Sequence, residues 1–133
     1  MADDGAVRRG DLIAVYGLLR AGEVGFEQFG LAHAFRDAGP CMLAGELWDL
    51  GRYPGLVEGE GRVLGELFEV RDPSVMADLD AYEDYWPHDL ARSRYERRRV
   101  DLIEPAGRQA WVYLWRLDLD GAVRIESGDW LKR

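Results

Sequence analysis

The sequence contains few of the side chains that usually bind metals or act as nucleophiles. Its one cysteine, Cys41, allows neither an internal disulfide nor a multi-cysteine metal site, and we interpret it as a small buried apolar residue. The two histidines, His33 and His88, have no partner at metal-ligand spacing. Ser74 and Ser127 lie outside any nucleophile-elbow pattern. The sequence therefore disfavours a Ser-His-Asp enzyme and predicts no metal site.

Glycine-rich phosphate patterns, excess basic charge and long apolar runs are also missing. Neither Gly-x-Gly-x-x-Gly nor a loop ending in Gly-Lys-Ser/Thr occurs. A net charge of −8 and a pI near 4.7 argue against nucleic acid as a partner. The locally basic stretch 92–99 is interpreted as outward-facing positions of a strand. No apolar run reaches the length of a membrane span and no signal peptide is visible, so we expect a cytoplasmic protein without a membrane partner.

The length and the apolar content fit one domain with a core of its own. The chain has 133 residues, of which 47% are hydrophobic. Residues 1–10 are small and polar and predict a flexible N-terminal leader. Residues 11–133 are expected to form a single domain, since no linker, repeat or low-complexity stretch interrupts them.

The order of the predicted elements indicates an α+β fold. Most of the strands are connected by loops or turns of the hairpin kind, including 51–55 and 104–108. This pattern favours a small mixed or antiparallel β-barrel with flanking helices. Strands are predicted over 12–16, 42–50, 61–70, 94–103 and 109–117, a loosely helical stretch over 23–36 and a capped helix over about 73–83.

An acidic residue falls on the predicted buried face of the capped helix. Asp72 can cap this helix and Pro73 fits its first turn. At about 100° per residue, Glu83 lies between Leu79 and Met76, on the side that should pack against the core. Burial of a carboxylate is costly unless it is paired or protonated, so Glu83 is a candidate acid/base residue. The other acids nearby flank this stripe or point away from it: Asp78, Asp80 and Asp84.

Two other interpretations of Glu83 remain open at this point. The helix can end at about Tyr82, which would place Glu83 in a solvated turn, or Glu83 can form an ion pair with an arginine. A glycosidase-like pair with Asp84 is disfavoured, because adjacent helical residues diverge by about 100°.

Two further segments can contribute to a site. A predicted strand ends at Tyr16 and opens into a loop that starts at Gly17 and has a second glycine, Gly22, so its N–H groups can bind an oxyanion, although an ordinary turn has the same pattern. The strand around Tyr113 is apolar on both faces and is expected to be sandwiched. Its aromatic side chains can be core residues or the wall of a pocket, and Tyr113 adds a hydroxyl group.

Six sequence blocks, in order over about residues 12–130, together resemble the gamma-glutamylcyclotransferase-like family. The resemblance covers nearly the whole chain, and six blocks in order are far more specific than one. The blocks are Val15-Tyr-Gly-Leu-Leu-Arg20, Gly45-Glu-Leu-Trp-Asp-Leu-Gly-Arg-Tyr-Pro-Gly-Leu56, Val63-Leu-Gly-Glu-Leu-Phe-Glu-Val70, Leu79-Asp-Ala-Tyr-Glu83 with Tyr85, Ala110-Trp-Val-Tyr113 and Ser127-Gly-Asp-Trp130.

The resemblance implies a small mixed barrel and a pocket between the Tyr-Gly loop and a glutamate. The family's catalytic glutamate, in Leu-Asp-x-x-Glu-Gly-Tyr, corresponds to Glu83. Two positions depart from the family pattern: Leu18 replaces a Ser or Thr, and Asp84 replaces a Gly. The expected substrate-binding residues are Tyr16, Gly17, Leu18, Leu19 and Tyr113.

The resemblance further implies cyclisation of a gamma-glutamyl amide to 5-oxoproline. The substrate's α-amine would attack its own γ-carbonyl with Glu83 as general base and then acid, so no protein nucleophile and no cofactor are expected. The expected partner is a small gamma-glutamyl substrate, and the protein is expected to be a monomer or homodimer. The alternative functions are a non-catalytic binding module of the same fold, and a structural protein whose pocket is filled by side chains.

Overall fold

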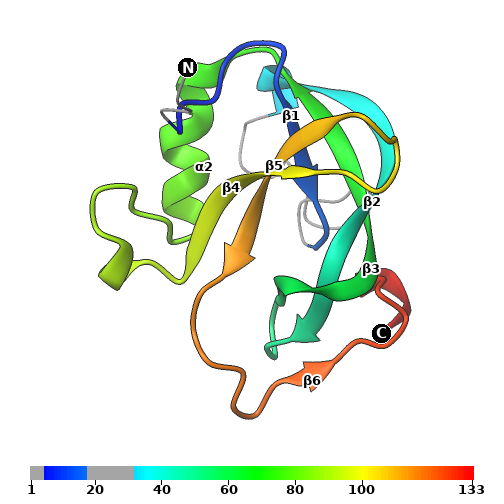
Figure 1. Cartoon of the computed structure of the whole chain (residues 1–133). Helices are drawn as coiled ribbons and strands as arrows, with labels where there is room; N and C mark the ends of the chain where they lie inside the picture. Colours follow the sequence, from blue (N-terminus) through cyan, green and yellow to red (C-terminus); the bar gives the residue numbers. More distant parts are fainter. Residues whose placement is uncertain (1–4, 18–31) are drawn as a thin grey trace.

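The computed structural model describes residues 5–17 and 32–133 (Figure 1). Six strands, one α-helix and four short 3-10 helices are formed by these residues. The strands are β1 (Leu12–Val15), β2 (Phe35–Asp49), β3 (Pro54–Val70), β4 (Tyr95–Asp101), β5 (Gln109–Trp115) and β6 (Val123–Arg124). The helices are α2 (Met76–Tyr82), η1 (Ala32–Ala34), η2 (Pro73–Val75), η3 (Leu90–Arg92) and η4 (Trp130–Lys132).

The strands form one mixed sheet in the order β4-β5-β1-β3-β2-β6. Strand β1 pairs in parallel with β5 and antiparallel with β3, and the remaining pairs are antiparallel. The sheet curls strongly, so that β3 and β5 approach each other on one side of it (Figure 1). The predicted α+β class and small curled mixed sheet are confirmed, in the form of a half-barrel with α2 on its outer side.

The long hairpin β2–β3 gives the sheet its curvature. Its register shifts between Asp37 and Gly39 and again between Ala44 and Glu46, and such bulges bend a strand pair. At the second bulge Gly45 has a φ of 146°. A Cβ there would lie 2.6 Å from the Val57 carbonyl oxygen, so the bend requires a glycine.

Both strands of this hairpin are longer than the sequence predicts. The helical stretch expected over 23–36 falls largely outside the described residues, but β2 already begins at Phe35, which pairs with Val70. The conformation of Phe35 is therefore determined by its burial and its pairing with a distant strand, and local helical spacing does not decide it. At the other end, the loop expected over 51–55 is shorter, because Pro54 pairs with Asp49 and already belongs to β3.

The sheet has a buried cluster on each of its faces. Strands β1 and β5 contribute to both clusters with alternate residues, which confirms that β5 is sandwiched. The cluster inside the curl includes Cys41, buried and free as predicted. The other cluster packs α2 against the sheet through Met76 and Leu79, together with Ile13, Val15, Ala34, Phe35, Val70, Val75, Tyr95, Trp111 and Tyr113.

Residues 5–10, part of the segment expected to be a flexible leader, contact the domain. The Gly10 N–H donates to the Val70 carbonyl at 2.8 Å, and Arg97 Nη1 donates to the Gly5 carbonyl at 2.9 Å. Val7 packs against the cluster under α2. The flexibility of the leader stays a prediction.

Candidate active site

The helix that carries the predicted acid ends one residue before it. Asp72 caps the preceding turn, accepting a hydrogen bond from the Ser74 N–H at 3.0 Å. Helix α2 ends at Tyr82, and Glu83 is its C-terminal cap, with its N–H donating to the Leu79 carbonyl at 3.0 Å. Glu83 is nevertheless half-buried and faces a cavity, so the early helix end does not place it in a solvated turn.

Four of the predicted site residues line one cavity of about 240 Å³. These four are Glu83, Tyr16, Gly17 and Tyr113. The two other predicted substrate-binding residues, Leu18 and Leu19, lie outside the described residues. The remaining lining comes from the ends of β1, β3 and α2 and from β4: Ala14, Val15, Tyr53, Pro54, Tyr82, Asp84, Arg94 and Tyr95.

The carboxyl group of Glu83 is held in an environment that favours its neutral form. Burial, and to a smaller extent the nearby negative charge of Asp80, together raise the pKa of Glu83 to about 8. Within the described part of the chain, no hydrogen bond or ion pair satisfies this carboxyl group. The alternative of a structural ion pair between Glu83 and an arginine therefore finds no support there.

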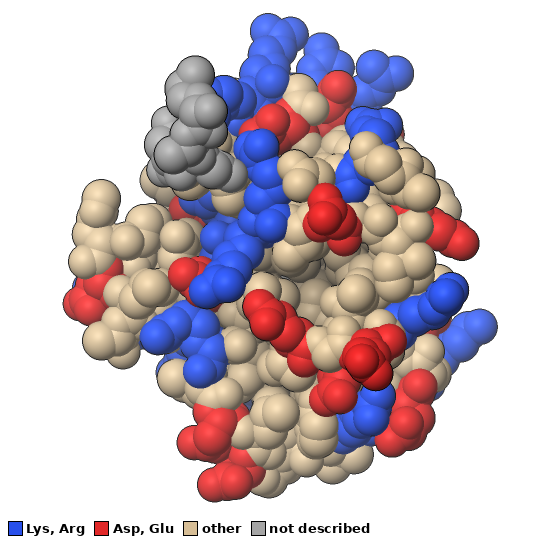
Figure 2. All heavy atoms as spheres, in the orientation of Figure 1, with Lys and Arg blue, Asp and Glu red and all other residues tan. Residues whose placement is uncertain are grey.

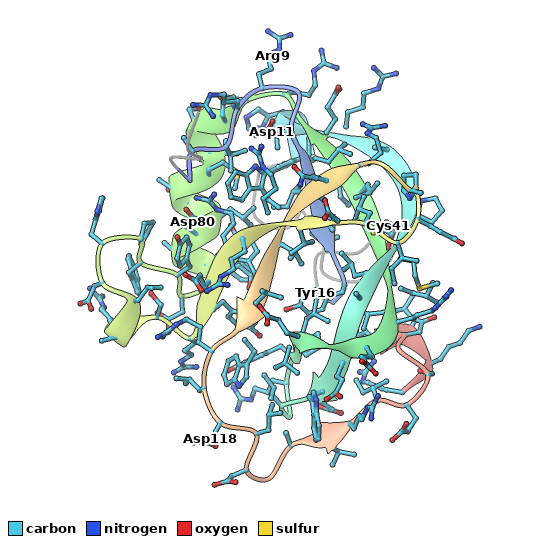
Figure 3. All side chains as sticks on the ribbon, in the orientation of Figure 1. Arg9, Asp11, Tyr16, Cys41, Asp80 and Asp118 are labelled. Atoms are coloured by element: carbon cyan, nitrogen blue, oxygen red, sulfur yellow. The ribbon has the colours of Figure 1, made fainter. Side chains whose placement is uncertain are left out.

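The Tyr16 hydroxyl group ties strands β1, β3 and β5 together. It donates to the Tyr113 carbonyl at 2.5 Å and accepts from the Leu56 N–H at 3.2 Å. Burial raises the pKa of Tyr16 far above its usual range, so this phenol stays neutral. Tyr16 lies at the end of β1, in the middle of the curled sheet (Figure 3). Its hydroxyl group thus stabilises the cavity wall by joining the strands that form it.

Gly17 contributes to the wall through its backbone alone. A Cβ at this position would lie 2.5 Å from Cγ of Pro54, a distance that real Cβ atoms do not reach. Because Pro54 lies at the start of β3, this contact fixes how closely the end of β1 approaches the hairpin. The glycine that follows the predicted strand is therefore needed for the close contact between Gly17 and Pro54, and both residues line the cavity.

A buried ion pair that the sequence did not predict lies behind Glu83. Asp80 is buried, and its two oxygens accept hydrogen bonds from Arg97 Nε and Nη2, each at 3.0 Å. The Tyr113 hydroxyl donates to Asp80 Oδ1 at 2.6 Å. Asp80 lies between α2 and the sheet (Figure 3). Tyr113 is therefore both a core residue and a part of the cavity wall.

The interpretation of the basic stretch as outward-facing is wrong for Arg97. Arg97 is on the same face of β4 as the buried Tyr95, because side chains alternate along a strand, and this face lies under α2. Arg98 points outward as expected and pairs with Glu96 at 2.8 Å.

On the face seen in Figure 2, basic side chains gather in a band with acidic ones beside them.

Asp84 and Arg94 form a charged pair at the mouth of the cavity. Arg94 Nε lies 3.1 Å from Asp84 Oδ2, and Arg94 Nη1 donates to the Tyr53 hydroxyl at 3.1 Å. Trp86 Nε1 donates to Asp84 Oδ1 at 2.6 Å. The charge of Asp84 is thus compensated at the surface, and the acid that acts on Glu83 is Asp80.

Comparison with known proteins identifies the family. The family model described as gamma-glutamyl cyclotransferase, AIG2-like, matches residues 13–132. The chain belongs to this family. It is 39% identical over 88 residues to the gamma-glutamylcyclotransferase family protein YtfP of Escherichia coli K12, which covers 66% of this chain and 69% of that protein.

Two more relatives extend the comparison across the chain. The gamma-L-glutamyl-butirosin B gamma-glutamyl cyclotransferase of Niallia circulans is 30% identical over 118 residues, which are 87% of this chain and 72% of that protein. The solution structure of ytfP from Escherichia coli superposes with a TM-score of 0.68 at 32% identity, and covers 90% of this chain and 96% of that one.

One departure from the gamma-glutamyl cyclotransferase pattern now has a structural account. Asp84, where this family usually has glycine, has a φ of 54°, in the left-handed region that glycine adopts most readily. Asp is among the few other residues that enter this region. The turn after Glu83 therefore keeps the backbone form that a glycine would give it.

The described residues hold no group of three or more His, Cys, Asp or Glu side chains that could bind a metal ion. None of their helices is both long and apolar enough to cross a membrane.

Proposed function

We propose that this protein is a cofactor-independent cyclotransferase that releases 5-oxoproline from gamma-glutamyl amides. The α-amine of the substrate attacks its own γ-carbonyl, a lactam C–N bond forms, and the original amide C–N bond breaks. Glu83 takes a proton from the attacking nitrogen and returns it to the leaving nitrogen. The products are 5-oxoproline and a free amine or amino acid.

The observation that carries this proposal is the carboxyl group of Glu83, unpaired among the described residues and facing the cavity. Its pKa of about 8 lies much nearer to the basic range of amines than the reference value of 4.5 does. Proton transfer between groups of matched pKa is nearly balanced in energy, which suits a residue that must act first as base and then as acid. Glu83 would therefore be ionised often enough near neutral pH to accept the proton and would give it up readily.

The Tyr-Gly loop is proposed to stabilise the tetrahedral intermediate. The backbone N–H groups of Gly17, Leu18 and Leu19 are the proposed donors to its oxyanion, and one such donor is typically worth about 3 kcal/mol. Gly17 supports this role because it lines the cavity without a side chain. Tyr16 and Tyr113 are proposed to shape the pocket that folds the substrate into its attack geometry.

The gamma-glutamyl amide is the substrate class best supported for this chain. The relative from Niallia circulans has a gamma-glutamyl compound, gamma-L-glutamyl-butirosin B, in its name. Membership of the same family supports this substrate class for the present chain. The leaving amine is proposed to lie toward the mouth, near Tyr53, Tyr82 and the Asp84–Arg94 pair.

A mass-spectrometric screen of gamma-glutamyl amides tests the proposal. The purified protein is expected to release 5-oxoproline from at least one amide, and no product from the same amide acetylated on its α-nitrogen, because the acetylated nitrogen is not a nucleophile. Release of glutamate instead of 5-oxoproline would indicate hydrolysis and contradict the mechanism. Ligand-induced thermal stabilisation with no product from any amide would favour the non-catalytic binding module.

A further inference from the structure

The buried Asp80–Arg97 pair has no part in the reaction as proposed above. Asp80 accepts three hydrogen bonds, two from Arg97 and one from Tyr113. Two parallel bonds from one guanidinium fix both oxygens of a carboxylate, and charge-assisted bonds of this kind are about twice as strong as neutral ones. Both side chains are almost fully buried, 7% exposed for Arg97 and 8% for Asp80, so solvent hardly screens this charge.

Asp80 precedes Glu83 by three residues at the end of α2. Side chains three apart on a helix are neighbours, with Cβ atoms about 5–6 Å from each other. The negative charge of Asp80 therefore disfavours the ionised form of Glu83. Its effect adds to that of burial, which is the larger cause of the raised pKa of Glu83.

The other groups that face Glu83 do not change their charge near neutral pH. They come from α2 and from strands β1, β4 and β5, and burial raises the pKa of each of these four phenols: Tyr82, Tyr16, Tyr95 and Tyr113. At the mouth, Arg94 is paired with Asp84 and hydrogen-bonded to Tyr53. Among the described residues, the buried fixed charges near Glu83 are thus Asp80 and its partner Arg97, and Asp80 is the one that raises the pKa of Glu83.

We infer that Asp80, held in place by Arg97 and Tyr113, is a positioning residue whose buried negative charge makes Glu83 a stronger base than burial alone would. This inference rests on the proposed role of Glu83, but its physical effect exists in the protein without substrate. Asp80 also connects the cavity wall to Glu83, because Tyr113 lines the cavity and donates a hydrogen bond to Asp80.

Titration of the Glu83 carboxyl carbon by NMR in the substrate-free protein tests this effect. In Asp80→Asn the acid dissociation constant of Glu83 is expected to rise about threefold or more, since a like charge at this range costs at least that much. The matched control is Asp78→Asn, which removes an exposed acid from the same helix and should leave the constant unchanged. Equal constants in wild type and Asp80→Asn would overturn the inference.

Asp80→Asn leaves the buried Arg97 unpaired and can prevent folding, so a second variant is needed. The double change Asp80→Asn with Arg97→Met removes the whole pair, a replacement that proteins often tolerate. Arg97 lies on β4 and bonds to Asp80, whereas Asp80 is one helical turn from Glu83, so the dissociation constant should still rise. No rise in the double variant would likewise overturn the inference.

The pH profile of turnover separates a positioning role from a merely structural one. In Asp80→Asn the acidic limb of kcat is expected to move to lower pH, and the plateau at high pH to fall about two- to threefold, as expected for a weaker base. An unmoved limb in an active enzyme would contradict the role. If the wild-type protein releases no 5-oxoproline, the proposed function fails, while the titration still decides the effect of Asp80 on Glu83.

Discussion

Glu83 combines three properties that a residue with only a packing role does not need. Its carboxyl group is half-buried, faces a cavity and has no bound partner within the described residues. Asp80, one turn earlier, is far better satisfied although it is more deeply buried. The two acids therefore differ in how the free-energy cost of burying a carboxylate is met. Hydrogen-bond partners offset this cost at Asp80, whereas at Glu83 the cost raises the pKa.

Because the ionised form of Glu83 is costly to bury, we expect Glu83 to destabilise the folded protein as pH rises. The folded-state pKa of about 8 lies above the reference value of 4.5, so between these values the folded state binds more protons than the unfolded state. Stability then falls as pH rises through this window. Between pH 6 and pH 8.5 the advantage of Glu83→Gln over wild type in free energy of unfolding is expected to grow by about 1–3 kcal/mol.

Urea unfolding of both proteins at the two pH values measures this difference. Gln keeps the shape of the side chain and cannot ionise, so changes in other groups cancel in the comparison. A Glu83→Gln advantage that is the same at pH 6 and pH 8.5 would contradict a raised pKa at this position.

At the scale of the elements, α2 could be predicted from the sequence, whereas the hairpin could be predicted only in part, without the full length of its strands. The helix depends on neighbours in the chain: Asp72 caps its first turn, and Met76 and Leu79 form its buried face. The limits of β2 and β3 depend on pairing partners up to 35 residues apart, such as Phe35 with Val70. Local spacing carries little information on such pairs, and around Phe35 it favours a helix instead of a strand.

The candidate site divides in the same way. Glu83 and Gly17 stand out locally, as an acid on an apolar helical face and as a glycine after a strand. The Asp80–Arg97–Tyr113 network joins α2, β4 and β5, and only the strand order brings these elements together. One local signal was available: Asp80 lies three residues before Glu83 and therefore beside it on the helix.

The contact between β1 and the start of β3 predicts the effect of Gly17→Ala. The new methyl group would overlap the Pro54 ring, since the Cβ position is 2.5 Å from Pro54 Cγ. Overpacking of this kind typically costs about 1–3 kcal/mol. Chemical denaturation should therefore show a loss of this size, and 5-oxoproline release should fall because the cavity wall shifts.

The matched control is Gly107→Ala, in the exposed turn between β4 and β5, where a Cβ meets no atom within 4 Å. Its cost comes from the positive φ of 79° alone, about 1–2 kcal/mol, and should leave turnover intact. Equal turnover in Gly17→Ala and Gly107→Ala would show that the Gly17 contact does not shape the cavity.

At the scale of the whole molecule, the half-barrel works as a frame that brings distant segments to one cavity. Strand β1 supplies Tyr16 and Gly17, β5 supplies Tyr113, and the end of α2 supplies Glu83. The family match over residues 13–132 spans all of these elements, and the similarity to the ytfP structure covers 90% of the chain. The frame is therefore a shared feature of the family.

The central claim, that Glu83 transfers the proton during cyclisation, is tested most directly by one rate comparison. Release of 5-oxoproline from the best gamma-glutamyl amide is measured near pH 8 for wild type, Glu83→Gln and the exposed control Glu126→Gln. Loss of a general base typically lowers the rate about 10²–10⁴-fold, so Glu83→Gln should fall by this factor while Glu126→Gln stays at the wild-type rate. A folded Glu83→Gln protein that releases 5-oxoproline as fast as wild type would contradict the account.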